Sequence, residues 1–186
     1  MMIQKASISR TIQIIALVLS LLLTFAWLGF IFSNSLKSGG ESGEQSSKVH
    51  QIVNQVAGSL GAKEAISEDA VRSGAHFTEF AILGFLCCLS IGALWRLCGV
   101  SQLPKLMGVA CLSLPLCAIF AAVDEFLQTF SEGRSAQFSD GLLDTAGSLA
   151  GITSFIGIVG FVWWLRRRRQ KGKRHEYFPR NDKRAE

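Results

Sequence analysis

The chain has 186 residues, of which 49% are hydrophobic and 18% are charged, and its formal net charge is +5. This length suits one domain, and the positive charge is concentrated in residues 166–186, which hold ten of the 19 Lys and Arg side chains. A nucleic-acid-binding protein needs a basic face on a folded domain. Because the rest of the chain is slightly acidic, we predict no nucleic-acid partner.

Apolar residues fall into four stretches long enough to cross a hydrocarbon core about 30 Å thick. The first, at about 11–32, carries no charge and is longer than the apolar core of a signal peptide, so we predict a retained span. The others lie at about 77–95, 106–123 and 141–165. The sequence therefore predicts an all-α fold, an integral membrane four-helix bundle.

The long segment between the first two spans predicts a short amphipathic helix, because its apolar residues recur at helical spacing. Such a helix lies on the outer membrane surface, covers a site, or packs on its neighbours, and the sequence leaves these alternatives open. The Gly- and Ser-rich residues 38–43 predict a flexible turn before it, and Ser67 predicts the N-cap of a helix leading into the second span. The apolar residues are Val49, Ile52, Val53, Val56 and Leu60.

Lys and Arg residues set the orientation of the spans, because cytoplasmic loops carry an excess of them. Basic residues precede the first span, and a run of arginines begins at Arg166, directly after the last. We therefore predict that both termini are cytoplasmic, with residues 1–165 as the transmembrane domain and residues 166–186 as a basic cytoplasmic tail. The long first loop and the acidic loop between the third and fourth spans then lie outside.

This orientation brings polar residues of three spans to the outer interface. Ionisable groups inside a membrane are costly and usually mark function, and Glu79 and Asp144 both lie within apolar runs. The alternative is that these residues only cap helix ends or hold a loop. The predicted site comprises His76, Glu79, Asp124, Glu125, Gln128, Arg134, Asp140 and Asp144.

We assign hypothetical roles by side-chain chemistry. Carboxylates in a partly desolvated site act as general bases or proton carriers, which makes Glu79, Asp124 and Asp144 the candidate catalytic residues. A guanidinium suits a phosphate or carboxylate, so Arg134 is a candidate for ligand binding. The other candidate ligand-binding residues are His76, Glu125, Gln128 and Asp140.

Metal and cofactor motifs are weak in this sequence. His76, Glu79, Asp124 and Asp140 supply nitrogen and oxygen donors, yet no tight spacing such as H-E-x-x-H occurs, so we predict no metal and no cofactor. The small-residue run 147–151 predicts close helix packing against another span or a second copy, so a homo-oligomer stays possible.

Five short motifs occur along the chain: Phe32-Ser33-Asn34-Ser35, His76-Phe77-Thr78-Glu79-Phe80, Asp124-Glu125-Phe126-Leu127-Gln128, Gly133-Arg134, and Asp140 to Gly147. Together they resemble the VanZ-like family of bacterial membrane proteins, which is named after a teicoplanin-resistance protein. The resemblance implies an integral protein of the bacterial cytoplasmic membrane and cell envelope, with a link to antibiotic resistance, and it implies no particular reaction. Phe80 stands where the family commonly has Tyr, and Glu132 replaces the usual Pro.

Three functions compete on this basis. The favoured one is an envelope protein with a polar site at the outer interface that binds a lipid-linked or lipopeptide ligand, in contact with membrane lipids. The second is a membrane enzyme acting on a lipid-linked envelope precursor, with Glu79 as general base. The third, a proton-coupled transporter, is disfavoured because the spans show no inverted repeat and their inner halves are apolar.

Overall fold

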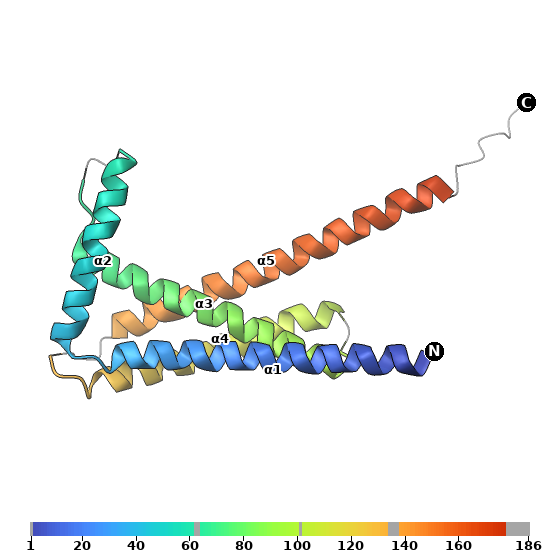
Figure 1. Cartoon of the computed structure of the whole chain (residues 1–186), viewed down its shortest axis with the longest axis horizontal. Coiled ribbons are helices and arrows are strands. Elements are labelled where there is room, and N and C mark those ends of the chain that lie inside the picture. Colours follow the sequence, from blue (N-terminus) through green and yellow to red (C-terminus); the bar gives the residue numbers. More distant parts are fainter. Residues whose placement is uncertain (1, 62–63, 101, 134–137, 178–186) are drawn as a thin grey trace, which may run out of the picture.

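The computed structural model of the chain describes residues 2–61, 64–100, 102–133 and 138–177, and these ranges form five helices without a strand. Four helices are long and apolar enough to cross a membrane, over Arg10–Ser35, Glu68–Leu97, Leu106–Gln128 and Phe138–Gln170. This confirms the predicted all-helical membrane bundle. The helices are α1 (Met2–Ser35), α2 (Gly39–Ser59), α3 (Glu68–Leu97), α4 (Gln102–Gln128) and α5 (Phe138–Tyr177), as Figure 1 shows.

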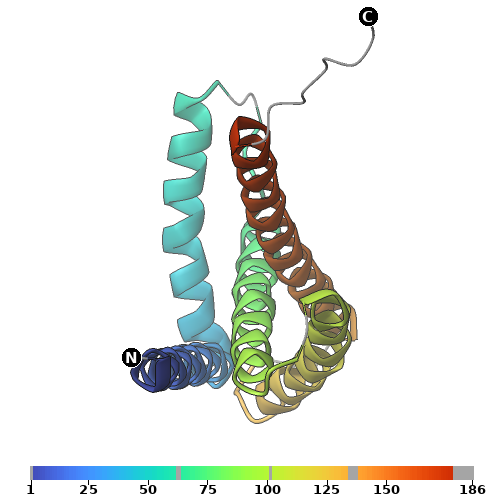
Figure 2. The same ribbon diagram turned by 90° about the vertical axis from the view of Figure 1, so that its right-hand side faces the viewer.

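Helix α3 is the centre of the bundle, because it packs against α1, α2, α4 and α5. Seen along the bundle, α4 and α5 lie on one side of α3 and α1 lies on the other (Figure 2). The main core joins α1, α3 and α4 through Ile31, Phe80 and Leu83, each fully buried, together with Cys117. A smaller cluster around Cys88, Val109 and Ile152 continues the packing toward the other end.

Helices α3 and α5 approach each other so closely that glycine is required at three positions. A Cβ atom at Gly151 would overlap the carbonyl oxygen of Ala81, and one at Gly147 would overlap that of Phe77. On the opposite helix, a Cβ at Gly84 would overlap the carbonyl oxygen of Ser148. The predicted small-residue run therefore packs against α3 of the same chain.

The prediction of a flexible turn at residues 38–43 is wrong, because α2 already begins at Gly39. Ser38 caps the helix: its Oγ accepts a hydrogen bond from the Glu41 backbone N–H at 3.3 Å, and the Glu41 side chain accepts one from the Ser38 N–H at 3.2 Å. This reciprocal pair satisfies two backbone donors. It outweighs the cost of placing glycines in the first turn.

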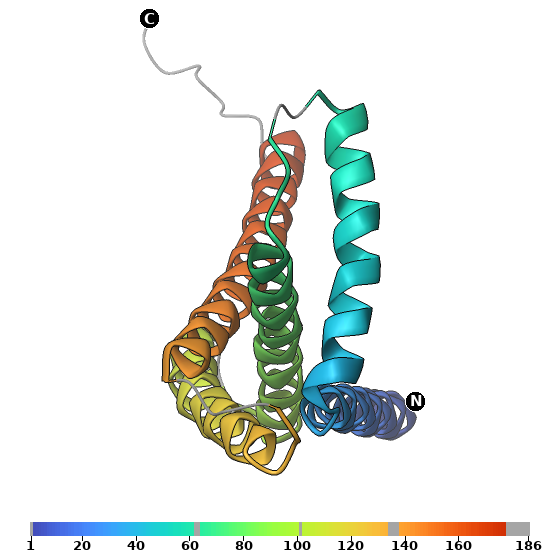
Figure 3. The ribbon, with the colours of Figure 1, turned by 90° about the vertical axis from the view of Figure 1, so that its left-hand side faces the viewer.

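Helix α2 stands crosswise to α1, as Figure 3 shows, and contacts the bundle through α3. None of its residues is buried, and the apolar side chains of Val49, Ile52 and Val56 are 47%, 62% and 53% exposed. Most of this face is therefore exposed, although Val53 is half-buried and the helix contacts α3. An exposed apolar stripe beside membrane-spanning helices suits the membrane surface.

Two anchors fix the position of α2. Near its C-terminal end the Asn54 amide donates to the Ile66 carbonyl oxygen at 3.1 Å, and its Oδ1 accepts from the Ile66 N–H at 2.7 Å. At its start the Gly39 N–H donates to the Glu132 carbonyl oxygen at 2.8 Å. The chain then enters α3, where the Ser67 Oγ accepts from the Ala70 N–H and confirms the predicted N-cap.

Candidate functional site

Three helices bring a histidine and two carboxylates together at one end of the bundle. His76 comes from the third turn of α3, Asp124 from the last turn of α4 and Asp144 from the second turn of α5. One ligand-type atom from each lies within 4.8 Å of the other two. His76 Nδ1 is 3.7 Å from Asp144 Oδ1, and both carboxylate side chains have no exposed surface.

Asp124 is held by hydrogen bonds on both of its oxygens. The Ser35 hydroxyl at the end of α1 donates to Oδ1 at 2.5 Å, and the Gln128 amide donates to Oδ2 at 3.0 Å. Ser35 is itself fixed, because its carbonyl oxygen accepts a hydrogen bond from the Ser131 hydroxyl at 2.9 Å. Hydrogen bonds of this kind orient a carboxylate and lower the cost of burying it.

Glu79 belongs to a separate polar chain beside this cluster. The Asn34 amide donates to Glu79 Oε1 at 3.1 Å, and the Lys37 ammonium donates to Asn34 Oδ1 at 2.8 Å. The Trp27 indole N–H donates to the Glu79 carbonyl oxygen at 2.9 Å, which ties α1 to α3 at this level. The Lys37 ammonium is therefore linked to the Glu79 carboxylate through the side-chain amide of Asn34.

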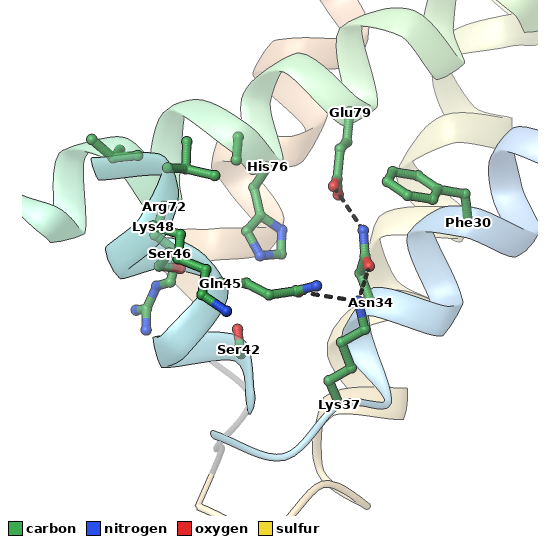
Figure 4. A pocket seen from close by; sticks show the side chains of 13 residues that line it. Phe30, Asn34, Lys37, Ser42, Gln45, Ser46, Lys48, Arg72, His76 and Glu79 are labelled. Carbon is green, nitrogen blue, oxygen red and sulfur yellow. Dashed lines mark hydrogen bonds between the residues drawn. The ribbon is translucent and has the colours of Figure 1, made fainter. Parts of the chain in front are cut away.

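A cavity of about 430 Å³ lies between α1, α2 and α3 beside these residues. Figure 4 shows His76 and Glu79 entering it from α3 and Asn34 from α1. The cavity reaches the surface at Gln45, Lys48 and Arg72, which are exposed. Its lining comprises Phe30, Asn34, Lys37, Ser42, Gln45, Ser46, Lys48, Val49, Val71, Arg72, Ala75, His76 and Glu79.

The predicted site residues are placed as follows. His76, Asp124 and Asp144 meet directly, Gln128 bonds Asp124, and Glu79 lies in the adjoining chain. Glu125 is buried facing Gly141 at the start of α5, where a Cβ would lie 3.5 Å from its Cγ. Asp140 is one turn before Asp144, half-buried, and accepts a hydrogen bond from Ser139 at 3.3 Å. Arg134 lies outside the residues that the structure describes.

The sequence-based prediction missed the contribution of the first span and left the role of α2 open. Asn34 and Ser35 bond the two carboxylates, and Lys37 and Ser42 line the cavity. Because Asn and Ser carry no charge, a prediction based on charged residues inside the membrane does not identify them. The only pointer was that Asn34 and Ser35 fall in one of the family motifs.

Comparison with known proteins gives a family. Residues 20–163 match the model of the family described as VanZ/LLP1, so the match covers most of the chain and every described site residue. No match is found among curated proteins or solved structures. The assignment of these residues to one site rests on the geometry described above. The chain belongs to the VanZ/LLP1 family.

Proposed function

We propose that this protein binds the anionic headgroup of a lipid-linked or lipopeptide ligand at the outer face of the bacterial cytoplasmic membrane. The observation that carries the proposal is the cavity between α1, α2 and α3, which combines basic, polar and apolar walls at one end of the candidate spans. Membership of a family of membrane proteins supports an envelope role. The link to teicoplanin resistance makes a lipoglycopeptide one candidate ligand.

The basic side chains of the cavity favour an anion. Lys37 and Arg72 line it from opposite sides, and Lys48 lines it while pairing with Glu44 at 2.8 Å. The Lys37 ammonium donates to the amide oxygens of Asn34 and Gln45, at 2.8 and 3.0 Å, and among the described residues it forms no ion pair with a carboxylate. A phosphate or carboxylate would accept charge-assisted hydrogen bonds from these groups.

The apolar side of the cavity favours a lipid. Phe30, which is 46% exposed on α1, and Val49 of α2 line it together with Val71. The apolar stripe of α2 continues from Val49 away from the cavity mouth through Ile52 and Val56. An interfacial helix places such a stripe at the boundary between headgroups and acyl chains. A lipid tail then leaves the cavity along Phe30 toward the bilayer.

The proposed orientation has both termini in the cytoplasm. At the far end of α5, Arg167 lies 4.0 Å from the Trp163 ring and Arg168 lies 4.1 Å from the Trp164 ring. Aromatic residues followed by basic ones are typical of the cytoplasmic membrane boundary. The site then lies at the opposite, outer boundary.

One observation favours a second candidate, an enzyme acting on the same kind of lipid. His76 lines the cavity and also lies 3.7 Å from the buried Asp144, so its ring connects a ligand site to a carboxylate. A histidine beside a carboxylate is a common general acid or base. The geometry gives less support to a proton-coupled transporter, because Glu79, Asp124 and Asp144 all lie at one end of the bundle.

We expect the full chain, reconstituted in phosphatidylcholine nanodiscs, to bind a fluorescent polyprenyl phosphate at least tenfold more tightly than the matching polyprenol. Arg72→Gln and Lys37→Gln should each weaken binding about tenfold, since a hydrogen bond to a charged group contributes about 1.5–3 kcal/mol and tenfold is about 1.4 kcal/mol. Fluorescence anisotropy measures both comparisons. Mass spectrometry of the recovered lipid distinguishes binding from turnover.

Arg169→Gln is the matched control, because it removes one exposed positive charge at the far end of α5. It should leave the affinity unchanged. A parallel titration with teicoplanin distinguishes a lipopeptide from a polyprenyl lipid. Equal affinity for the phosphate and the alcohol, without teicoplanin binding, would contradict the proposal, as would full affinity in the Arg72→Gln, Lys37→Gln double variant.

A further inference from the structure

We propose that His76, Asp124 and Asp144 bind one divalent transition-metal ion, Zn²⁺ or Mn²⁺, beside the cavity, which His76 also lines. The proposal goes beyond ligand binding and does not depend on it, since the site is formed by side chains of α3, α4 and α5. It departs from the expectation drawn from sequence spacing, which was that no metal binds.

The spacing of the three side chains suits a single bound ion. The three ligand-type atoms lie within 4.8 Å of one another, and His76 Nδ1 and Asp144 Oδ1 are 3.7 Å apart. That separation is too long for a hydrogen bond. Two ligands bound at 2.0–2.1 Å to a tetrahedral ion lie about 3.4 Å apart. The pair is therefore spaced as two ligands of one ion.

The buried negative charges of the cluster favour a cation. Asp144 is fully buried, and neither of its carboxylate oxygens accepts a hydrogen bond from any described residue. His76 Nδ1 is likewise buried without a hydrogen bond among the described residues. A buried carboxylate is costly unless it is paired or coordinates a metal. His76 is the ion-pair partner of Asp144 at 3.7 Å, but even when protonated it offsets only one of the two negative charges of Asp124 and Asp144. A divalent cation between Asp124 and Asp144 would balance both of their negative charges.

The surroundings of Asp124 support coordination. Its oxygens are oriented by the Ser35 hydroxyl and the Gln128 amide, at 2.5 and 3.0 Å. Ligating carboxylates characteristically have such outer partners, which fix their direction. Each oxygen can still bind an ion through its remaining lone pair.

The donor set selects the class of ion. One imidazole and two carboxylates suit Zn²⁺ or Mn²⁺, whereas Ca²⁺ takes six to eight oxygen ligands. Three protein ligands leave at least one coordination position open. Because His76 also lines the cavity, that position is available to water or to an anionic oxygen of a bound ligand.

The test uses the full chain, purified in detergent without a polyhistidine tag and stripped with a chelator. After equilibration with Zn²⁺ or, separately, Mn²⁺ and gel filtration, we expect plasma mass spectrometry to find one ion per chain with at least one of them. Asp144→Asn and His76→Ala should each lower the affinity about a hundredfold or more, because loss of an outer partner alone costs 10–100-fold. The ion should also raise the melting temperature of the wild-type chain but not that of Asp144→Asn.

Matched controls remove similar groups outside the cluster. His50→Ala and Asp69→Asn should keep one ion per chain at unchanged affinity, since neither residue is among the three clustered ligands. Co²⁺ substitution should give no sulfur charge-transfer band, which excludes binding at Cys98 or Cys111, the exposed cysteines. An absence of stoichiometric metal, equal uptake by Asp144→Asn, or a sulfur band would each overturn the proposal. Lipid binding plays no part in these readouts.

Discussion

Replacement of Gly151 by valine should lower the melting temperature of the detergent-solubilised protein by about 6–12 °C. The new side chain would overlap the carbonyl oxygen of Ala81, and its Cβ would lie 3.0 Å from the Phe85 backbone nitrogen. Neither backbone atom can move without shifting α3. Overpacking of this kind costs about 3 kcal/mol or more, and about 1 kcal/mol changes the melting temperature by about 2–4 °C at this chain length.

Gly157→Val is the matched control, because it makes the same change on the same helix. No atom lies within 4 Å of a Cβ placed at Gly157, so its melting temperature should change by less than about 2 °C. Tryptophan fluorescence during heating measures both variants. Equal melting temperatures for the two variants would show that α3 and α5 do not meet at Gly151.

Asp124→Ala should be comparably destabilising, by about 3–5 kcal/mol. It removes two hydrogen bonds to a buried charge, those from Ser35 and Gln128, each worth about 1.5–3 kcal/mol, and leaves the donors without that acceptor. Ser35→Ala removes one of the two bonds and should cost less. In a double-mutant cycle, Ser35→Ala should have little further effect in the Asp124→Ala background.

The variant Asp124→Asn distinguishes the role of Asp124 in stability from its proposed role in metal binding. The Ser35 hydroxyl can rotate and the Gln128 amide can turn over, so an asparagine keeps both hydrogen bonds while removing the charge. We expect a melting temperature within a few degrees of the wild type and a loss of metal binding. Stability lost to the same degree in Asp124→Asn and Asp124→Ala would mean that the negative charge itself holds the bundle together.

Much of the fold follows from local features of the sequence. Apolar runs must be about 20 residues long to cross a bilayer, so their lengths mark the spans. Each predicted span lies within a helix, and the helices extend further at the polar end because local capping continues them. The Ser67 N-cap, for example, starts α3 at Glu68, earlier than the predicted span at 77.

The candidate site was only partly predictable, for a different physical reason. The Lys and Arg bias brought His76, Asp124 and Asp144 to one face, but three ligands from three helices leave no short spacing motif. Asn34 and Ser35 are uncharged and sit at the end of an apolar run, so their role depends on packing. Glycines 147 and 151 indicated a close helix contact in the sequence. That the partner helix is α3 follows only from the register of α3 against α5 in the structure.

The most direct test of an outward-facing site is labelling with a membrane-impermeant maleimide in intact spheroplasts. Gly43→Cys in α2 and Glu132→Cys after α4 place exposed thiols beside the site in a chain otherwise without cysteine. The native Cys98, exposed at the end of α3 and about 33 Å of helix from His76, reports the opposite side when it is the sole cysteine. We predict that the thiols introduced by Gly43→Cys and Glu132→Cys react in intact spheroplasts and that Cys98 reacts only after permeabilisation. The reverse pattern would place the site in the cytoplasm and contradict a site for ligands of the outer face.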